Sequence, residues 1–271
     1  MRVLPGRLVL LGHPVAHSLS PLFQNAALRQ AGIPLEYEAV DVAPADLADT
    51  LGRLRSIAAA GNVTIPHKEA VAAHCEELTA VARRAQAVNT FWFANSRLIG
   101  DNTDVGGFEA AARELLGPNG LRGVRSVAVI GAGGSAAAVL AAVERWPGVR
   151  ARVSGRTHDR ARSLCARFAE LATPVPSTTD AVRGADLVVN ATPVGLADDA
   201  LPIDPALLAP GAAVIDLVYR RGATALVRAA RRLGLRATDG MTVLLEQGAL
   251  AFERWFGIAP DRQAMREALS R

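Results

Sequence analysis

The segment SVAVIGAGGSAAAVLAAV, residues 126–143, decides the fold of this chain. It joins an apolar, strand-like run to an alanine-rich helical run through a turn with the spacing G-x-G-x-x-A, at Gly131, Gly133 and Ala136. The first glycine permits a tight turn, the second lets the backbone approach a pyrophosphate, and the alanine keeps strand and helix close. Glycine-rich turns without a function also occur, but here strand, turn and helix are all in order. The segment therefore predicts a dinucleotide site at a helix N-terminus.

The same pattern continues toward the C-terminus. Short runs rich in branched apolar residues follow, with helical segments between most of them, at residues 149–155, 185–192, 212–219 and 235–240. Strands that are buried on both faces have this composition. A doubly wound parallel sheet is therefore expected from residue 126 onward.

The N-terminal part of the chain also alternates between apolar runs and helical patterns. Strands are expected at residues 7–12, 35–42 and 61–66, with helices at 20–32 and 43–57. The segment AVNTFWFANSRLIGDNTD is typical of a β-hairpin that turns at ANSR. This alternation predicts a second α/β unit.

The expected elements divide the 271 residues into an α/β protein of two domains. The last two helices, near residues 241–257 and 261–269, lie beyond the second sheet and are expected to return to the first domain. The first domain is therefore residues 1–104, completed by residues 240–271, and the dinucleotide-binding domain is residues 105–239. A cleft between two such domains is the natural place for an active site.

The end of the second strand of the dinucleotide unit indicates which cofactor is bound. An NAD site usually places an acid there, but this chain has Gly155, Arg156 and Thr157, with Arg160 one helical turn later. A guanidinium and a hydroxyl suit a 2′-phosphate, which an acid would repel. NADP is therefore expected. Two alternatives stay open, namely that Asp159 reaches the ribose or that Arg156 is only a solvated charge.

Lys68 is the only lysine in the chain, because the other 29 of its 30 basic Lys and Arg residues are arginines. Coding bias could leave one lysine by chance. The chemical alternative is that an ammonium can exchange a proton during a reaction, whereas a guanidinium stays protonated. Lys68 is therefore a candidate proton-transfer group.

Composition excludes several classes of protein. Half of the residues are hydrophobic, yet the sequence contains neither a membrane span nor a signal peptide, so a cytoplasmic protein is expected. The net charge of +4 is scattered, which argues against nucleic-acid binding and leaves anionic small molecules as partners. Cys75 and Cys165 lack metal-ligand spacing, so we expect no metal and two small buried thiols.

Short polar segments in the first domain lie where strands are expected to end. Any one of them fits ordinary capping or turn formation, as Ser20 before Pro21 would cap a helix. Together they predict many small donors and acceptors around one polyhydroxylated substrate. With the cofactor turn, the chain closely resembles the shikimate dehydrogenase family over nearly its whole length. The likeness rests on GHPVAHSLSP, NVTIPHK, AVNT, GDNTD, GAGGSA, NATPVG and GMTVLLEQGA, in the family's order and approximate spacing.

The resemblance implies NADP-dependent interconversion of 3-dehydroshikimate and shikimate, a step toward aromatic amino acids. It implies catalytic roles for Lys68 and Asp104. The implied substrate-binding residues are Ser18, Ser20, Asn62, Thr64, Asn89, Tyr219 and Gln247. The implied cofactor-binding residues are Gly131, Gly133, Gly134, Ser135, Ala136, Gly155, Arg156, Thr157, Arg160, Asn190, Ala191, Thr192, Gly240 and Met241. A monomer or homodimer is expected, with no nucleic-acid or membrane partner.

Two departures from the family's pattern concern loops near the expected site. The segment YRRGAT after Val218 lacks the proline that many relatives have between the tyrosine and the threonine, so the role of Tyr219 stays open. In the cofactor turn, GRT replaces the more usual Asn-Arg-Thr, which removes one adenosine-ribose contact but keeps the phosphate clamp.

Reduction of a ring ketone requires a group that stabilises the developing oxyanion and supplies a proton. Lys68 is expected to do both, with Asp104 holding its ammonium in place. In the oxidative direction the lysine must accept the proton, so activity is expected to rise with pH. The alternatives are a quinate or aminoshikimate dehydrogenase on the same scaffold, a folate-linked dehydrogenase, and a non-catalytic dinucleotide-binding regulator.

Overall fold

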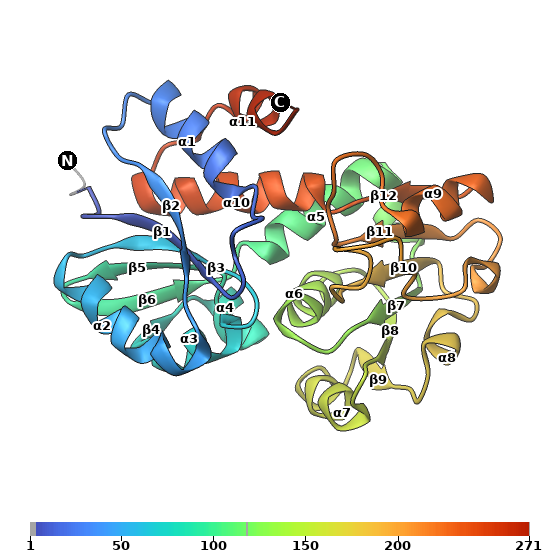
Figure 1. Cartoon of the computed structure of the whole chain (residues 1–271). Coiled ribbons are helices and arrows are strands. Elements are labelled where there is room, and N and C mark those ends of the chain that lie inside the picture. Colours follow the sequence, from blue (N-terminus) through green and yellow to red (C-terminus); the bar gives the residue numbers. More distant parts are fainter. Residues whose placement is uncertain (1–3, 118, 271) are drawn as a thin grey trace. The chain divides into compact units, whose positions relative to one another are not determined.

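The computed structural model describes residues 4–117 and 119–270, which fall into two compact units (Figure 1). Unit 1 contains the chain up to Gly107 together with the segment from Leu245 onward, and unit 2 runs from Phe108 to Leu244. The sequence predicts these boundaries after Asp104 and after Asp239. The fold is α/β, as expected.

Unit 1 is built on a six-stranded mixed sheet with the strand order β2-β1-β3-β5-β6-β4. Its strands are β1 (Leu8–Gly12), β2 (Tyr37–Asp41), β3 (Ala60–Val63), β4 (Glu77–Leu78), β5 (Thr90–Ala94) and β6 (Arg97–Asp101). Strand β1 pairs in parallel with β2 and β3, whereas β5 is antiparallel to β3 and β6. The carboxyl ends of β1, β2 and β3 therefore meet at one edge of the sheet, where open α/β sheets bind ligands.

Helices lie on both faces of this sheet. The helices of unit 1 are η1 (Pro44–Asp46), α1 (Ser20–Gln30), α2 (Leu47–Ser56), α3 (Lys68–His74), α4 (Ala80–Ala85) and α11 (Arg262–Ser270), with the first turn of α5 (Asp104–Leu116) and all but the first turn of α10 (Met241–Phe256). Figure 1 shows α2 and α3 on one side and α1, α10 and α11 on the other. Helix α2 buries Leu47, Leu51 and Leu54 in a core that includes Phe91 of β5. Their helical spacing explains why this segment forms a helix.

The C-terminal helices return to unit 1, as the sequence predicts. Nε2 of Gln24 in α1 donates a 2.9 Å hydrogen bond to the carbonyl oxygen of Gly248 in α10. The indole N–H of Trp255 donates to the hydroxyl of Thr90 over 3.1 Å. Phe252 and Met265 are fully buried. The last helices are therefore part of the core of unit 1.

Strands β5 and β6 form the expected hairpin. Ala94 pairs with Arg97, so only Asn95 and Ser96 lie between the strands. Both of these residues have positive φ, at 50° and 58°, which is the conformation of a type I′ turn. The hairpin places Asn89 at the start of β5 close to the residues that follow β6.

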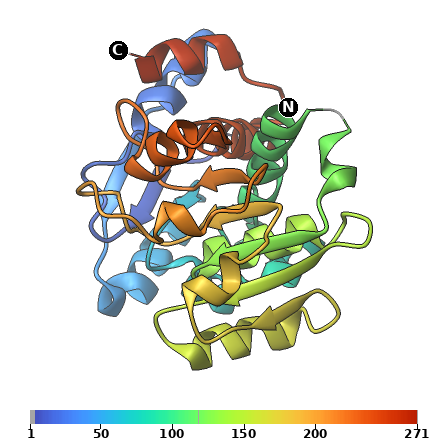
Figure 2. The same ribbon diagram turned by 90° about the vertical axis from the view of Figure 1, so that its right-hand side faces the viewer.

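Unit 2 contains a six-stranded parallel sheet with the order β12-β11-β10-β7-β8-β9 (Figure 2). Its strands are β7 (Ser126–Ile130), β8 (Arg150–Ser154), β9 (Ala172–Pro174), β10 (Leu187–Asn190), β11 (Ala213–Asp216) and β12 (Arg236–Thr238). The chain runs outward from β7 to β9, then crosses back and continues from β10 to β12. This is the Rossmann order, and the strand order reverses between β7 and β10.

Helices α6 (Gly134–Val143), α7 (His158–Arg167), α8 (Thr178–Val182) and α9 (Ala225–Arg232), with η3 (Pro205–Leu207), connect these strands, and η2 (Gly120–Gly123) precedes β7. Every residue of α6 from Ala136 to Val143 is buried. That explains why its sequence is apolar on all sides. Helix α9 packs Leu226, Val227 and Ala230 into the core on β11.

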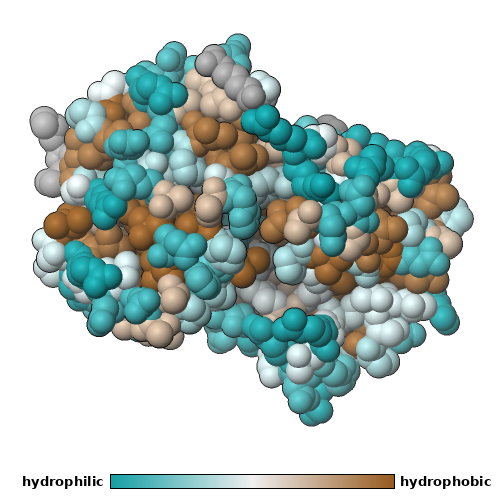
Figure 3. Space-filling view, viewed as in Figure 1, coloured by the Kyte–Doolittle hydropathy of each residue, from teal (hydrophilic) through white to brown (hydrophobic). Residues whose placement is uncertain are grey.

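Within the described part of the chain, no helix is long and apolar enough to cross a membrane. On the face seen in Figure 3, apolar residues in brown are interrupted throughout by polar residues in teal.

Candidate active site

Lys68 and Asp104 form an ion pair in unit 1. Lys68 is the first residue of α3, which follows β3, and Asp104 is the first residue of α5, which follows β6. Nζ of Lys68 donates to Oδ2 of Asp104 over 2.6 Å. The two side chains are 13% and 15% exposed, so the pair is largely withdrawn from water but can still meet a ligand. The fold thus joins the only lysine of the chain to a carboxylate 36 positions away.

Asn89 connects this ion pair to the returning helix α10. Its Nδ2 lies 2.9 Å from Oδ1 of Asp104, 3.0 Å from Oε1 of Gln247 and 2.9 Å from the hydroxyl of Thr103. Its Oδ1 accepts from the backbone N–H of Thr103 over 2.6 Å. One oxygen of Asp104 therefore faces Lys68 and the other faces Asn89. Thr103 was not among the predicted site residues, because its place within GDNTD gave it no distinct signal.

Asn62 is held at the end of β3 by two hydrogen bonds. Its Nδ2 donates to the carbonyl oxygen of Asn89 over 3.0 Å, and the hydroxyl of Tyr37 donates to its Oδ1 over 2.8 Å. The ring of Tyr37 lies 6.0 Å from that of Trp255. The sequence gave no reason to single out Tyr37, which lies in an ordinary strand pattern. Thr64, one residue beyond β3, is half-buried and donates its N–H to Leu11 of β1.

Ser18 and Ser20 lie where the segment after β1 enters α1. The N–H of Ser20 donates to Oγ of Ser18 over 3.2 Å. The alternative that Ser20 caps α1 is not what the structure shows, because the helix begins at Ser20 itself and Leu19 occupies the N-cap position. Within the part of the chain that the structure describes, the Ser20 hydroxyl has no hydrogen-bond partner. It is therefore available to a ligand.

The predicted substrate residues do not all lie in one unit. Ser18, Ser20, Asn62, Thr64, Asn89 and Gln247 lie in unit 1 with Lys68 and Asp104. Tyr219 lies in unit 2, between β11 and α9, and is half-buried. The loop after it departs from the family's pattern, and here Arg220 and Arg228 both bind the carboxylate of Asp199, over 2.8 and 2.9 Å. These ion pairs tie the Tyr219 loop to the long loop after β10.

The turn between β7 and α6 contains the glycines predicted to bind a pyrophosphate. Gly131 has a φ of +119°, and a Cβ there would lie 2.7 Å from the carbonyl oxygen of Ala191. Only glycine fits this position. Gly133 occupies the N-cap position of α6, with Gly134, Ser135 and Ala136 in the first turn. Backbone N–H groups of a first helical turn, together with the helix dipole, form an anion site.

The second segment predicted to bind the cofactor begins at the end of β8, beside this turn. Arg156, Thr157 and Arg160 are exposed, and Gly155 is half-buried. A Cβ at Gly155 would lie 3.1 Å from Cβ of Ala132, so a larger residue would require a small shift of the turn. The two guanidinium groups and the hydroxyl are accessible to an anion.

Asn190, at the end of β10, is fully buried and organises the loop that follows. Its Nδ2 donates to Oδ1 of Asp216 over 2.8 Å, and its Oδ1 accepts from the N–H and the hydroxyl of Thr192. Asp216 also accepts from the hydroxyl of Thr224 over 2.7 Å. Burial raises the pKa of Asp216 above its usual range despite these donors. The sequence did not single out Asp216, because an acid at a strand end is common.

Gly240 and Met241 follow β12 and begin α10. A Cβ at Gly240 would lie 2.2 Å from the carbonyl oxygen of Leu217, so only glycine allows the loops after β11 and β12 to run this close. The N–H of Met241 donates to Oδ1 of Asp239 over 3.0 Å. Burial raises the pKa of Asp239, as it does for Asp216.

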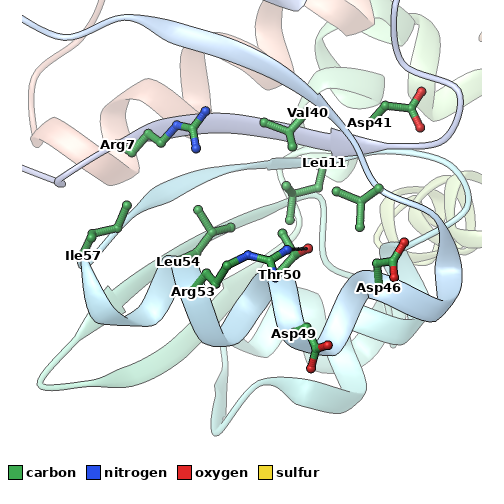
Figure 4. A pocket seen from close by; sticks show the side chains of 11 residues that line it. Arg7, Leu11, Val40, Asp41, Asp46, Asp49, Thr50, Arg53, Leu54 and Ile57 are labelled. Atoms are coloured by element: carbon green, nitrogen blue, oxygen red, sulfur yellow. Dashed lines mark hydrogen bonds between the residues drawn. The ribbon is translucent and has the colours of Figure 1, made fainter.

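A pocket of about 380 Å³ opens between α2 and the strands β1 and β2 of unit 1 (Figure 4). Its floor includes Leu11, Val40 and Leu54, and its rim carries charged side chains such as Arg7 and Asp46. None of the predicted site residues lines it.

The described residues include no group of three or more His, Cys, Asp or Glu side chains that could hold a metal ion.

Burial raises the pKa of the Cys75 thiol to about 12 and that of the Cys165 thiol to about 11. Both thiols therefore stay protonated near neutral pH and are poor nucleophiles.

One α/β unit contains a lysine and carboxylate pair, and the other contains a glycine-rich turn of the dinucleotide-binding type. Together these features are typical of a nucleotide-dependent dehydrogenase. The chain belongs to the shikimate dehydrogenase family. The family model of the shikimate dehydrogenase substrate binding domain matches residues 10–91, and that of the shikimate 5′-dehydrogenase C-terminal domain matches residues 240–269.

Curated relatives and solved structures agree with this assignment. Shikimate dehydrogenase (NADP(+)) of Rubrobacter xylanophilus is 45% identical, covering 96% of this chain and 94% of the relative. The crystal structure of shikimate 5-dehydrogenase from Thermus thermophilus in complex with NADP(H) and shikimate has a TM-score of 0.85 and 40% identity over 98% of both chains. Quinate dehydrogenase from Corynebacterium glutamicum in complex with NAD has a TM-score of 0.86 and 31% identity over 97% of both chains.

Proposed function

We propose that the chain is an NADP-dependent shikimate dehydrogenase, which reversibly reduces the ring ketone of 3-dehydroshikimate to shikimate. The observation that carries this proposal is the largely buried pair of Lys68 and Asp104, oriented by Asn89 at the carboxyl end of the unit 1 sheet. The relatives of more than 40% identity that are named shikimate dehydrogenase (NADP(+)) support the same activity.

Lys68 would act on the oxygen atom of the reacting carbon. NADPH, when bound, supplies the hydride that reduces this carbon. Negative charge then develops on the oxygen, and the ammonium of Lys68 stabilises this charge and donates its proton to form the alcohol. In the reverse direction the neutral amine accepts that proton. Asp104 holds Nζ in position through the 2.6 Å hydrogen bond.

The remaining polar groups of unit 1 would bind and orient the substrate. The hydroxyls of Ser18 and Ser20 suit the carboxylate, because each can donate a hydrogen bond to an anion. The side chains proposed to contact the ring hydroxyls are Asn62, Thr64, Asn89 and Gln247, with Tyr219 contributed by unit 2. Asn62 and Asn89 are already fixed by hydrogen bonds to the protein, so their orientation costs little entropy on binding.

The residues of unit 2 fit the proposed cofactor. The turn at Gly131 and Gly133, with the first turn of α6, would hold the pyrophosphate. The exposed Arg156, Thr157 and Arg160 would hold the 2′-phosphate of NADP. The loops containing Ala191 and Thr192 and containing Gly240 and Met241 would flank the nicotinamide.

The proposal is tested by following NADPH absorbance after shikimate and NADP are added to the protein at alkaline pH. We expect substrate-dependent formation of NADPH. Parallel assays with quinate, and with NAD in place of NADP, should give lower kcat/KM values. A higher value with quinate would favour the rival dehydrogenase, and bound NADP without turnover would favour a non-catalytic regulator.

A further inference from the structure

The segment that carries Ser18 and Ser20 is attached to the end of β2 by one carboxylate. Nδ1 of His13 lies 2.5 Å from Oδ1 of Asp41, and the backbone N–H of Val15 donates to Oδ2 of the same residue over 3.2 Å. An ionised carboxylate only accepts hydrogen bonds, so Nδ1 of His13 is the donor. Asp41 therefore binds this segment through a side chain and through the backbone. Figure 4 shows its carboxylate turned away from Val40 and the apolar floor of the pocket.

A continuous series of hydrogen bonds leads from Asp41 to the serines. The carbonyl oxygen of Val15 accepts from the N–H of Ser18 over 3.0 Å, and Oγ of Ser18 accepts from the N–H of Ser20. Val15 is 3% exposed, so its peptide groups lie in a packed environment that limits their movement. Displacing Val15 would therefore also displace both hydroxyl groups.

His13 also weakens the repulsion that the Asp41 carboxylate would exert on a negatively charged ligand. Asp41 is a negative charge close to a segment that is proposed to receive a negatively charged ligand. The hydrogen bond from His13 lowers the pKa of Asp41, so the carboxylate stays ionised near neutral pH and remains a strong acceptor. The N–H group of His13 also partly compensates the negative charge of the Asp41 carboxylate.

We propose that Asp41, with His13, is a positioning pair that holds Ser18 and Ser20 in the arrangement that binds the substrate carboxylate. Neither side chain needs to touch the substrate. The proposal rests on the proposed function, because it assumes a carboxylate ligand at the two serines.

The test compares Asp41→Ala with Asp46→Ala in the full-length enzyme. Asp46 is an exposed acid just beyond β2 whose side chain has no hydrogen bond or ion pair among the described residues. For Asp41→Ala we expect KM for shikimate to rise about 3- to 10-fold, with kcat and KM for NADP nearly unchanged. Asp46→Ala should match the wild type.

Two further variants separate positioning from folding. Asp41→Asn keeps an oxygen that can accept from Val15, so it should restore most of the wild-type KM. His13→Ala removes an exposed ring and should raise KM in the same direction by a smaller factor. Asp41→Ala in a Ser18→Ala background should add little to the effect of Ser18→Ala alone, because both changes act on one contact.

Shikimate methyl ester, which lacks the negative charge, shows whether the effect concerns the carboxylate. The rise in KM caused by Asp41→Ala should be much smaller for the ester than for shikimate. An equal rise for both substrates, an unchanged KM for shikimate, or a fall in kcat would overturn the positioning role. An inactive wild-type enzyme would instead refute the proposed function, and this inference with it.

Discussion

At the scale of single residues, the proposed chemistry depends on an amine that can exchange a proton within a confined site. Nζ of Lys68 lies 2.6 Å from Oδ2 of Asp104, and its side chain is 13% exposed. A guanidinium at this position would keep the positive charge. It would not readily give up a proton, and its broader head would not fit a site shaped for an ammonium.

Lys68→Arg is therefore expected to lower kcat by about 10²- to 10⁴-fold, the contribution of a general acid and base. Binding of NADP should be nearly unchanged, because the turn at Gly131 lies in unit 2. Steady-state kinetics with shikimate and a fluorescence titration with NADP measure the two effects separately. A variant that retains most of the wild-type turnover would contradict the role of the lysine.

Asn89→Asp tests the residue that orients Asp104. The substitution replaces a donor 2.9 Å from Oδ1 of Asp104 with a carboxylate, so attraction becomes repulsion. We expect kcat to fall about 10- to 100-fold, since hydrogen bonds to charged groups contribute about 1.5–3 kcal/mol. Asn95→Asp, in the exposed hairpin turn, introduces the same charge and should leave kcat unchanged. Equal kinetics for the two variants would contradict the orienting role.

The residues that the sequence missed share one property, which is that their partners are distant along the chain. Tyr37 lies in an alternating strand pattern, and only the fold brings its hydroxyl to Asn62, 25 positions away. Asp216 holds Asn190 across 26 positions. Lys68 could be found because its residue type is rare in this chain, and Asn89 because it belongs to a recognisable motif.

At the scale of elements, the backbone geometry of the turn between β7 and α6 bears on the proposed cofactor site. Gly131→Ala is expected to abolish measurable NADP binding and to lower stability by about 1–3 kcal/mol, the cost of a strained backbone conformation. The reason is the φ of +119° and the 2.7 Å approach to Ala191. NADP titration and thermal unfolding measure these changes.

Gly184→Ala is the matched control for this turn. Gly184 also has a positive φ in unit 2, at +65°, but a Cβ there meets nothing within 4 Å. The Gly184→Ala substitution should lower stability somewhat and leave NADP binding intact. If the two variants bound NADP equally well, the close approach of the backbone at Gly131 would not be required for NADP binding.

The turn after β8 is proposed to determine the choice between NADP and NAD. Arg156→Ala is expected to raise KM for NADP about 10- to 100-fold, the loss of a charge-assisted hydrogen bond, and to leave KM for NAD unchanged. Arg162→Ala, an exposed arginine in the following helix, serves as the control. A parallel rise in both KM values would show that Arg156 does not bind the 2′-phosphate.

The sequence pattern predicted most of the strands, including the three-residue β12, but missed the short strands β4 and β9. The expected strands at residues 7–12 and 35–42 correspond to β1 and β2, and the hairpin turns where expected. Strands β4 and β9 have two and three residues, and no run of branched apolar residues marks them in the sequence. Both are added at sheet edges by packing rather than by their own sequence.

At the scale of the whole molecule, unit 1 is assembled from both ends of the chain. The sequence predicted this return because helical segments remained after the last strand of the Rossmann order. It could not predict which contacts secure it. One of them is the 2.7 Å ion pair between Arg254 in α10 and the buried Asp101 at the end of β6. Composition alone would place Asp101 on the surface, where Arg254 does lie.

Unit 2 contains the buried Asp216 and the half-buried Asp239, which make stability depend on pH in an uncommon direction. Burial raises the pKa of Asp216 and of Asp239 above the ordinary value of 3.8. In the window between 3.8 and the raised values, the folded state binds protons that the unfolded state does not. Stability from these groups therefore increases as pH falls through that window. Asp41, Glu76 and Asp199 have lowered pKa values, so their smaller contributions are lost only as pH falls below the ordinary carboxyl range.

Asp216→Asn removes one of the two carboxyl groups with a raised pKa. The variant therefore isolates the contribution of Asp216 to the pH dependence of stability. Thermal unfolding of the wild type and the variant should be compared at several pH values between about 7 and the ordinary carboxyl range near 4. We expect the unfolding midpoint of the wild type to rise relative to that of the variant as pH is lowered, because only the wild type gains a proton on Asp216. A difference that does not change with pH, or that changes in the opposite direction, would mean that the hydrogen bonds from Asn190, Thr224 and Val218 outweigh burial.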